Sequence, residues 1–113
     1  MANDADPYRV DEETMGRLKA LAGDDLAELE AVCSALADPR RLTILRLLTV
    51  SELCVCDLVE IFEMEYSKLS YHLKQLREAG LVETDRDGNF VTYELTPTGR
   101  RAAEGLLEAF EAA

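Results

Sequence analysis

Residues 66–95 read YSKLSYHLKQLREAGLVETDRDGNFVTYEL, and this stretch decides the fold. Its first part predicts a helix over 66–79, because leucines recur at helical spacing. The core side of that helix would carry Leu69, Leu73 and Leu76. The second part predicts two short strands, 81–84 and 90–95, joined through an Asp-Gly turn signal. A polar helix followed directly by a β-hairpin is typical of a winged helix-turn-helix arrangement.

The residues before this stretch predict further helices. The apolar spacing favours one helix over 8–22 and another over 26–37. Asp38-Pro39 is a restart signal, since Asp can cap a helix and Pro suits its first position. Ser51 is the N-cap candidate for the next helix, 52–62.

After the hairpin, Thr96-Pro97-Thr98 predicts the start of a last helix. The expected fold is therefore mainly α with a β-hairpin wing, a winged helix-turn-helix. Three parts are expected: an acidic arm and first helix over 1–25, the winged core over 26–95, and a last helix over 96–113.

Composition favours one globular domain. The chain has 113 residues, of which 48% are apolar and 31% are charged, so it can bury a modest core. No apolar run approaches the roughly 18–20 residues that a membrane span needs. The acidic N-terminus lacks the apolar core of a signal peptide, so we expect a cytoplasmic protein without a membrane partner. No nucleophile–base pair, phosphate loop or paired-carboxylate motif indicates an enzyme.

The charge distribution qualifies the net charge of −11. A strongly acidic chain argues against nucleic-acid binding, which usually leaves a basic footprint. Residues 66–80, however, hold three cations against one carboxylate, and 31–51 hold the same numbers. A local basic face on an acidic body can still meet DNA, although a solvated acidic surface without a partner is the alternative.

The cysteines are the chemical signal of the chain. Cys54 and Cys56 lie one residue apart in the stretch ELCVCDL, and Cys33 is the third cysteine. Closely spaced thiols outside a disulfide scaffold indicate metal or redox chemistry, because soft thiolates bind soft ions and can also be oxidised. Two alternatives stay open, a redox or persulfide switch and a pair of small buried hydrophobes. Cys33 lies on an apolar stripe, which favours a place in the core.

Four stretches taken in order carry a family resemblance. They are ALADPRRLTILRLL, ELCVCDLVEIF, SKLSYHLKQLREAGLV and DGNFVTYELTP, and together they resemble the ArsR/SmtB family of metalloid- and metal-responsive repressors. The resemblance covers about residues 29–107. It implies a homodimer formed through the first and last helices and bound to operator DNA. It also implies release of that DNA when an inducer binds the cysteine pair.

The resemblance also assigns residues. It places the inducer at Cys54 and Cys56. A third ligand, which these two residues do not supply, would be Cys33, a group from the other subunit or a small exogenous thiol, unless two sulfurs suffice. The inducer would be arsenite or antimonite, with Cd(II), Pb(II) or Zn(II) as alternatives, and no permanent cofactor is expected. DNA contacts would come from the helix, the wing and the restart: Ser67, Lys68, Ser70, Tyr71, His72, Lys74, Gln75, Arg86, Arg40 and Arg41.

The chain departs from the family pattern at three places. Val59 stands where arsenite sensors of this type often carry a third Cys, so the third donor is open. Tyr71 replaces a common Arg, and Glu63 and Glu65 add negative charge beside the DNA. Residues 96–113 contain neither His nor Cys, so the family's other metal site, on the last helix, is not expected.

The spacing of the thiols predicts a distortion on binding. Residues i and i+2 of an intact helix point about 200° apart. If Ser51 caps the helix, one ion could reach both sulfurs only after the first turn unwinds. Such unwinding would link the inducer site to the helix that supports the reading helix.

Overall fold

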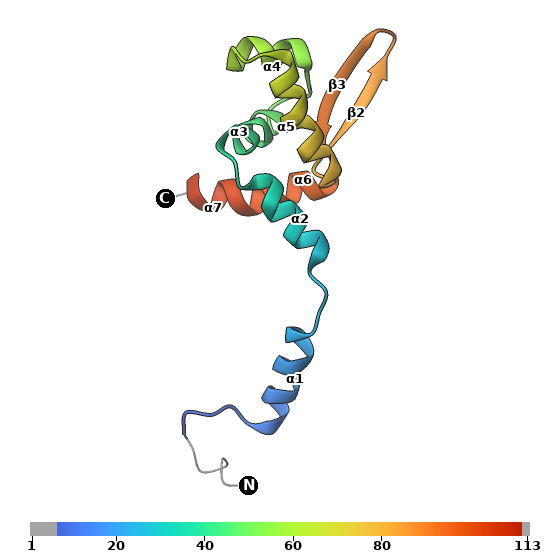
Figure 1. The fold of residues 1–113 in the computed structure, drawn as a ribbon. Helices are drawn as coiled ribbons and strands as arrows, with labels where there is room; N and C mark the ends of the chain where they lie inside the picture. The colour runs from blue at the N-terminus through green and yellow to red at the C-terminus, as the bar shows by residue number, and fades with distance from the viewer. Residues whose placement is uncertain (1–6, 112–113) are drawn as a thin grey trace.

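The computed structural model describes residues 7–111, which form a chain of helices interrupted by a small sheet (Figure 1). The elements in order are α1 (Glu12–Ala22), α2 (Ala27–Leu36), α3 (Pro39–Leu48), β1 (Leu53–Cys54), α4 (Val55–Phe62), α5 (Tyr66–Glu78), β2 (Val82–Asp87), β3 (Phe90–Leu95), α6 (Pro97–Ala102), the π-helical segment η2 (Ala103–Leu107) and α7 (Glu108–Glu111). The winged helix-turn-helix prediction is confirmed, with α4 and α5 as the helix pair and β2–β3 as the wing.

Side-chain caps fix where most helices begin. The Asp38 carboxylate accepts hydrogen bonds from the backbone N–H groups of Arg40 and Arg41, at 2.8 and 3.2 Å, and Pro39 occupies the first turn of α3 as expected. Asp11 caps α1 through Thr14, so this helix begins later than residue 8. Such caps satisfy backbone donors that a helix start otherwise leaves unpaired.

The wing is longer than the sequence indicated, and it has a third strand. β2 and β3 pair in antiparallel register from Val82↔Leu95 to Asp87↔Phe90, leaving Gly88 and Asn89 in the turn. Gly88 has a φ of 63°, a left-handed conformation that glycine adopts at low cost. β1 joins the free side of β3, which gives the strand order β1-β3-β2.

The expected start of the fourth helix is wrong. Ser51 does not cap it, because its hydroxyl donates to the carbonyl of Glu52 instead. Leu53 and Cys54 are extended and pair with Tyr93 and Thr92 of β3, so α4 starts only at Val55. Pairing across forty residues of sequence overrides the local capping signal.

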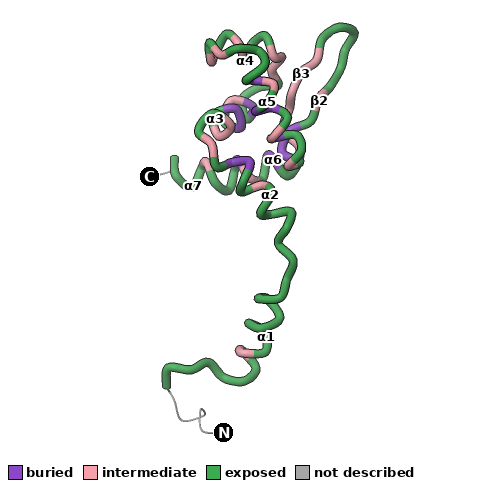
Figure 2. Tube along the Cα trace, in the orientation of Figure 1, coloured by how far each residue is buried: buried purple, intermediate pink, exposed green. Residues whose placement is uncertain are grey.

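The core lies where α3, α4 and α5 meet the base of the wing (Figure 2). The fully buried large side chains are Ile44, Leu45, Leu58, Leu69, Leu73, Leu76, Leu81 and Val82. The predicted leucine stripe of α5 is therefore the inward face of that helix. Burying one such side chain contributes about 1.5–3 kcal/mol.

α1 stands apart from this core, at the end of an extended link (Figures 1 and 2). None of its residues is buried. The apolar side of α1 is therefore not part of the core of this chain. Within residues 7–111 no helix combines the length and apolar character that crossing a membrane requires.

Candidate functional site

Cys54 lies at the junction between the helix pair and the wing. Its backbone is extended, with φ −83° and ψ 165°, and it is the N-cap of α4. Its Sγ accepts the N–H of Asp57 at 3.2 Å, and the Asp57 carboxylate accepts the N–H of Cys54 at 3.1 Å. This reciprocal pair is a capping box in which sulfur takes the usual hydroxyl role. On its other side, Cys54 pairs with Thr92 of β3.

Cys56 completes the thiol pair. The two sulfurs form a disulfide, with a Cα–Cα distance of 5.3 Å. The expectation that the first helical turn must unwind is wrong, because Cys54 lies outside the helix and both sulfurs are already on one side. In the reduced form they would be two adjacent thiols at a helix start, where backbone N–H groups and the dipole favour negative charge.

Asp57 offers a third possible metal ligand beside the two cysteines. Within the described residues, the one group able to hold a metal ion is Cys54, Cys56 and Asp57, whose ligand atoms all lie within 4.8 Å of one another. Cys33 is not among them. It lies exposed on α2, so its expected place in the core is also wrong. An Asp three residues after an N-cap position is the signal that sequence reasoning missed.

Cys33 borders an apolar groove of about 670 Å³ between α2 and the C-terminal helix, by which we mean the consecutive elements α6, η2 and α7. Leu29, Leu106 and Phe110 line the groove and are 56%, 47% and 85% exposed. Apolar side chains exposed together in this way are typical of an interface.

The exposed side of α5 carries most of the predicted DNA contacts. Ser67, Lys68, Tyr71 and Lys74 are exposed, and Ser70 and Gln75 are half-buried. Lys68 also lies beside Arg40, in a hollow of about 370 Å³ that Glu63 and Glu65 share. Glu63 has a φ of 52°, which ends α4 and turns the chain toward α5. Two cations thus meet two carboxylates at this corner.

His72 and Arg41 differ from the rest of the predicted DNA-contacting set. His72 is only 5% exposed and faces the interior, between the core leucines of α5. Arg41 donates to the carbonyl of Ala35 through Nε at 2.5 Å, and its Nη1 lies 3.2 Å from His72 Nδ1. The prediction of a direct DNA contact is corrected for His72, which is buried, whereas Arg41 is half-buried and holds His72 and Ala35 within the chain, so its DNA contact stays a prediction.

The wing offers one cation among carboxylates. Arg86 is exposed near the tip, on β2. At the base of the sheet, burial raises the pKa of Glu94, and the negative charges of Glu83, Glu52 and Asp85 raise it further. This acidic side of the wing would repel phosphates, so Arg86 is the part of the wing suited to approach them.

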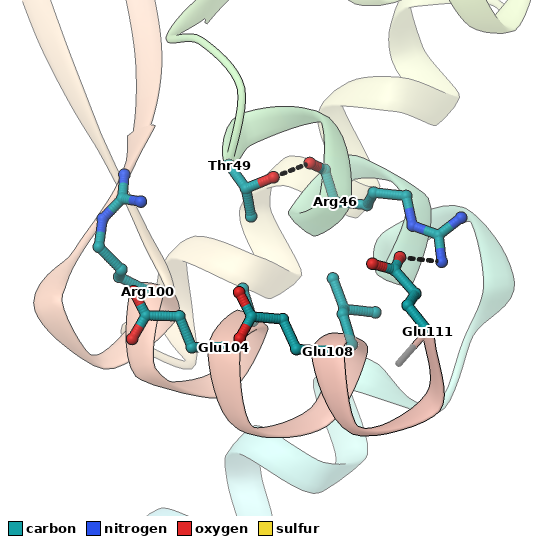
Figure 3. A pocket seen from close by; sticks show the side chains of 8 residues that line it. Arg46, Thr49, Arg100, Glu104, Glu108 and Glu111 are labelled. Atoms are coloured by element: carbon teal, nitrogen blue, oxygen red, sulfur yellow. Dashed lines mark hydrogen bonds and ion pairs between the residues drawn. The ribbon is translucent and has the colours of Figure 1, made fainter. Parts of the chain in front are cut away.

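A separate polar hollow lies between α3 and the C-terminal helix (Figure 3). Arg46 forms an ion pair with Glu111 across it, and Glu104 and Glu108 line the helical side. The lining contains no His or Cys. Its polar lining consists of charged surface groups, and the cysteine pair lies elsewhere, at the junction of β1 and α4.

Comparisons with known proteins agree with this arrangement. Residues 38–84 match the family described as "Bacterial regulatory protein, arsR family". The arsenical resistance operon repressor of Staphylococcus xylosus is 46% identical over 68 residues, which cover 60% of this chain but only 65% of that protein. The chain thus spans slightly under two thirds of the length of that relative.

Two further matches extend over more of the chain. The putative arsenical resistance operon repressor ArsR of Halobacterium salinarum is 39% identical, covering 80% of this chain and 71% of that protein. The homodimeric winged helix-turn-helix DNA-binding domain of Mb0332 from Mycobacterium bovis superposes with a TM-score of 0.68 at 30% identity, covering 94% of this chain and 92% of that one. The chain therefore belongs to the arsR family of bacterial regulatory proteins.

Proposed function

We propose that this chain is a transcription repressor that binds operator DNA and releases it when a thiophilic ion occupies the Cys54–Cys56 pair. One observation carries the proposal: Cys54 is at once the N-cap of α4 and the ladder partner of the wing strand β3. A ligand on its sulfur therefore acts on the wing and on α4, the helix that packs against the proposed reading helix α5. The repressor names of the two relatives support the same reading.

The proposed DNA surface is the exposed side of α5 with the wing tip. Lys68, Lys74 and Arg86 supply charge for phosphates, and Arg40 adds a cation beside Lys68. Ser67, Ser70, Tyr71 and Gln75 are the polar groups available for base edges. The cations make us expect an affinity that falls as salt rises, and the carboxylates of Glu63 and Glu65, which repel phosphates, should keep that affinity modest.

The proposed assembly is a homodimer through α1 and the C-terminal helix. α1 exposes Leu18 and Leu21, with exposed Val10 just before it, and the groove beside Cys33 exposes Leu106 and Phe110. A second copy of the chain would cover both surfaces, as the homodimeric neighbour supports. The arm and first helix over 1–25 and the last helix over 96–113 then act as dimerisation parts around the winged core, 26–95; residues 1–6 and 112–113 lie outside the described part.

The donor set fits a soft ion. Cys54 and Cys56 would hold it as thiolates, which requires the reduced pair, and the Asp57 carboxylate is the nearest further donor. A bound ion supplies strong bonds to sulfur. Arsenite or antimonite suits the thiolates best, whereas Cd(II), Pb(II) or Zn(II) tolerates a carboxylate as third ligand. The identity of the third ligand atom, sulfur or carboxylate oxygen, therefore decides between a trivalent metalloid and a divalent metal ion.

The coupling follows from the capping box. The Cys54 sulfur accepts the Asp57 N–H, and the Asp57 carboxylate accepts the Cys54 N–H. Turning either the Cys54 sulfur or the Asp57 carboxylate toward an ion leaves a backbone N–H at the start of α4 without its acceptor. The loss of such a cap costs about 1 kcal/mol. Because β1 holds Cys54 against β3, the shift reaches the wing. Thermodynamic linkage then requires DNA to weaken ion binding by the same factor.

The test uses the reduced full chain and a duplex of the DNA upstream of its own gene. We expect salt-dependent binding that arsenite or antimonite reverses, and sedimentation of the free chain as a dimer. Binding to a scrambled duplex of equal length serves as the control. Equal affinity for both duplexes, or a monomer at the concentrations that bind DNA, would contradict the proposal.

Asp57→Asn separates the ion classes. The amide oxygen can still accept the Cys54 N–H, so the cap and DNA affinity should persist, but the anionic ligand is lost. We expect Cd(II) affinity to fall about tenfold or more, with arsenite affinity nearly unchanged, because arsenite depends on the sulfurs. Thiolate-to-metal absorbance measures both. An equal loss for both ions would contradict a ligand role for Asp57.

The disulfide favours a second candidate, a redox-switched repressor. A peroxide would take two electrons and two protons from the two thiols, forming the S–S bond and two molecules of water. This candidate predicts that peroxide lowers DNA affinity, that a thiol reductant restores it, and that arsenite has no effect on the reduced protein.

A further inference from the structure

His72 is an unusual residue to find in the core. It is the one polar side chain classed as buried in the described part of the chain, at 5% exposure. It lies on α5 between Leu69 and Leu73, and its ring meets the Tyr71 ring edge-on at 5.6 Å. A buried polar group is costly unless it is hydrogen-bonded, so its partner matters.

Arg41 is that partner, and it bridges three helices. Its Nε donates to the Ala35 carbonyl near the end of α2, and its Nη1 lies 3.2 Å from His72 Nδ1 on α5. Asp38 fixes the backbone from which Arg41 projects, by accepting the N–H of Arg41 at 3.2 Å. We call this connection the Ala35–Arg41–His72 bridge. It links α2, which borders the apolar groove, to α5.

The bridge requires a neutral histidine. A guanidinium only donates hydrogen bonds, so Nδ1 must accept and the ring proton must sit on Nε2. Protonation of Nδ1 would remove the acceptor and set two cationic donors against each other. The arrangement therefore has two states that differ by one proton.

We propose that His72 and Arg41 are positioning residues that hold α5 in its DNA-reading orientation only while His72 is neutral, so that acid weakens DNA binding. The proposal rests on the proposed DNA-binding function. It predicts the opposite sign to a histidine that simply lies near phosphates, which would gain charge in acid and tighten binding.

The surroundings of His72 support the neutral state. Burial lowers its pKa below 6.5. The charge of Asp38 opposes this shift, whereas Arg41 and Arg40 on α3 and Lys68 on α5 add to it. The folded chain then binds fewer protons than the unfolded chain just below pH 6.5. Its stability is full above that pH and declines as the pH falls toward the folded pKa.

The experiment measures DNA affinity of the reduced full chain between about pH 7.5 and 5.5 at fixed ionic strength, using the duplex of its own upstream DNA. His72 is the only histidine, so no other side chain has an ordinary pKa within this range. We expect affinity to fall about three- to tenfold toward acid, where one pKa unit corresponds to tenfold. Circular dichroism at each pH confirms that the chain stays folded.

Two variants separate positioning from packing. His72→Asn keeps an acceptor near the place of Nδ1 and cannot titrate, so binding should stay near the wild-type value and become independent of pH. His72→Leu fills similar space without an acceptor, so binding should be weak and equally flat. Wild-type binding that tightens or stays level in acid, or a His72→Asn variant that keeps the wild-type slope, would overturn the proposal.

NMR of the histidine ring keeps the inference testable without DNA. The Nε2–H tautomer with a pKa below 6.5 is the expected result. An Nδ1–H tautomer, or a pKa at or above 6.5, would overturn the bridge. Failure to bind the duplex at any pH would instead count against the proposed function, while the ring measurements still decide the state of His72.

Discussion

Replacing Cys54 and Cys56 together by serine is expected to preserve binding to the proposed operator DNA and to abolish release by arsenite. Serine is a favoured N-cap residue, so its hydroxyl can take over the acceptor role of the Cys54 sulfur toward the Asp57 N–H. The fold and the DNA affinity should therefore persist. A hydroxyl oxygen is a poor ligand for a soft ion, so the inducer loses both of its strong bonds.

The size of the effect follows from coupling between the two sites. Allosteric coupling of about 1–3 kcal/mol corresponds to a 5–150-fold change in affinity. Arsenite should weaken DNA binding by wild type within this range and leave the double variant unchanged. Anisotropy of a labelled duplex, with and without arsenite, measures both ratios.

Cys33→Ser is the matched control. Cys33 lies on α2 and outside the group of possible ligands, so this variant should release DNA like wild type. Release of the double variant by arsenite would reject the sensor assignment. If Cys33→Ser no longer released DNA, Cys33 of the second copy in the proposed dimer would be a ligand after all.

The sequence predicted correctly those elements whose structure depends on residues close together in the chain. The Asp38-Pro39 start of α3, the leucine stripe of α5 and the glycine turn of the wing all appear as expected, because each rests on neighbours along the chain. The start of α4 did not follow, since Cys54 is held by Thr92 on a distant strand. A single-sequence pattern cannot show which strand edge will be filled.

The burial of His72 could have been predicted from its position along the helix, although its residue type is polar. Leu69, His72 and Leu73 stand at positions i, i+3 and i+4, which lie on one face of a helix. The spacing alone places His72 with the core stripe. Its polarity and the family resemblance pointed to the DNA instead. The partner Arg41, on another helix, explains why the interior accepts it.

The sequence did not show whether the apolar side of α1 packs inside the chain or stays exposed. Its spacing predicted the helix, and Leu18 and Leu21 remain 46% and 64% exposed. The same spacing serves a core and an interface equally well, so only the fold distinguishes them.

Gly99→Ala is expected to destabilise the folded chain strongly. A Cβ at this position would meet the backbone carbonyl oxygen of Leu81 far inside 3.0 Å, and the Leu95 side chain at 3.3 Å. The Leu81 carbonyl cannot retreat, because it accepts the Thr96 N–H at 3.1 Å. Thr96 also donates from its hydroxyl to the Gly80 carbonyl at 2.6 Å. The start of α6 is thus fastened against the start of the wing.

The added methyl must therefore push α6 away from the wing. Overpacking of this kind costs about 1–3 kcal/mol, and a rigid backbone neighbour favours the upper end. A loss of about 2–3 kcal/mol in the free energy of unfolding lowers Tm by roughly 4–8 °C per kcal/mol for a domain of this size. Thermal denaturation at one protein concentration measures it, because the proposed dimerisation would make Tm depend on concentration.

Gly16→Ala isolates the steric cause. Gly16 lies within α1 and a Cβ there meets nothing within 4 Å, so only helix propensity changes, by about 0.5–1 kcal/mol in favour of the folded state. Opposite shifts of Tm in the two variants would locate the cost at the Leu81 carbonyl. Equal shifts would show that α6 can move away freely, and that the C-terminal helix is not fixed to the wing. Because that helix lines the groove beside Cys33, Gly99→Ala should also weaken dimerisation, while the free thiols of its folded fraction keep their affinity for arsenite.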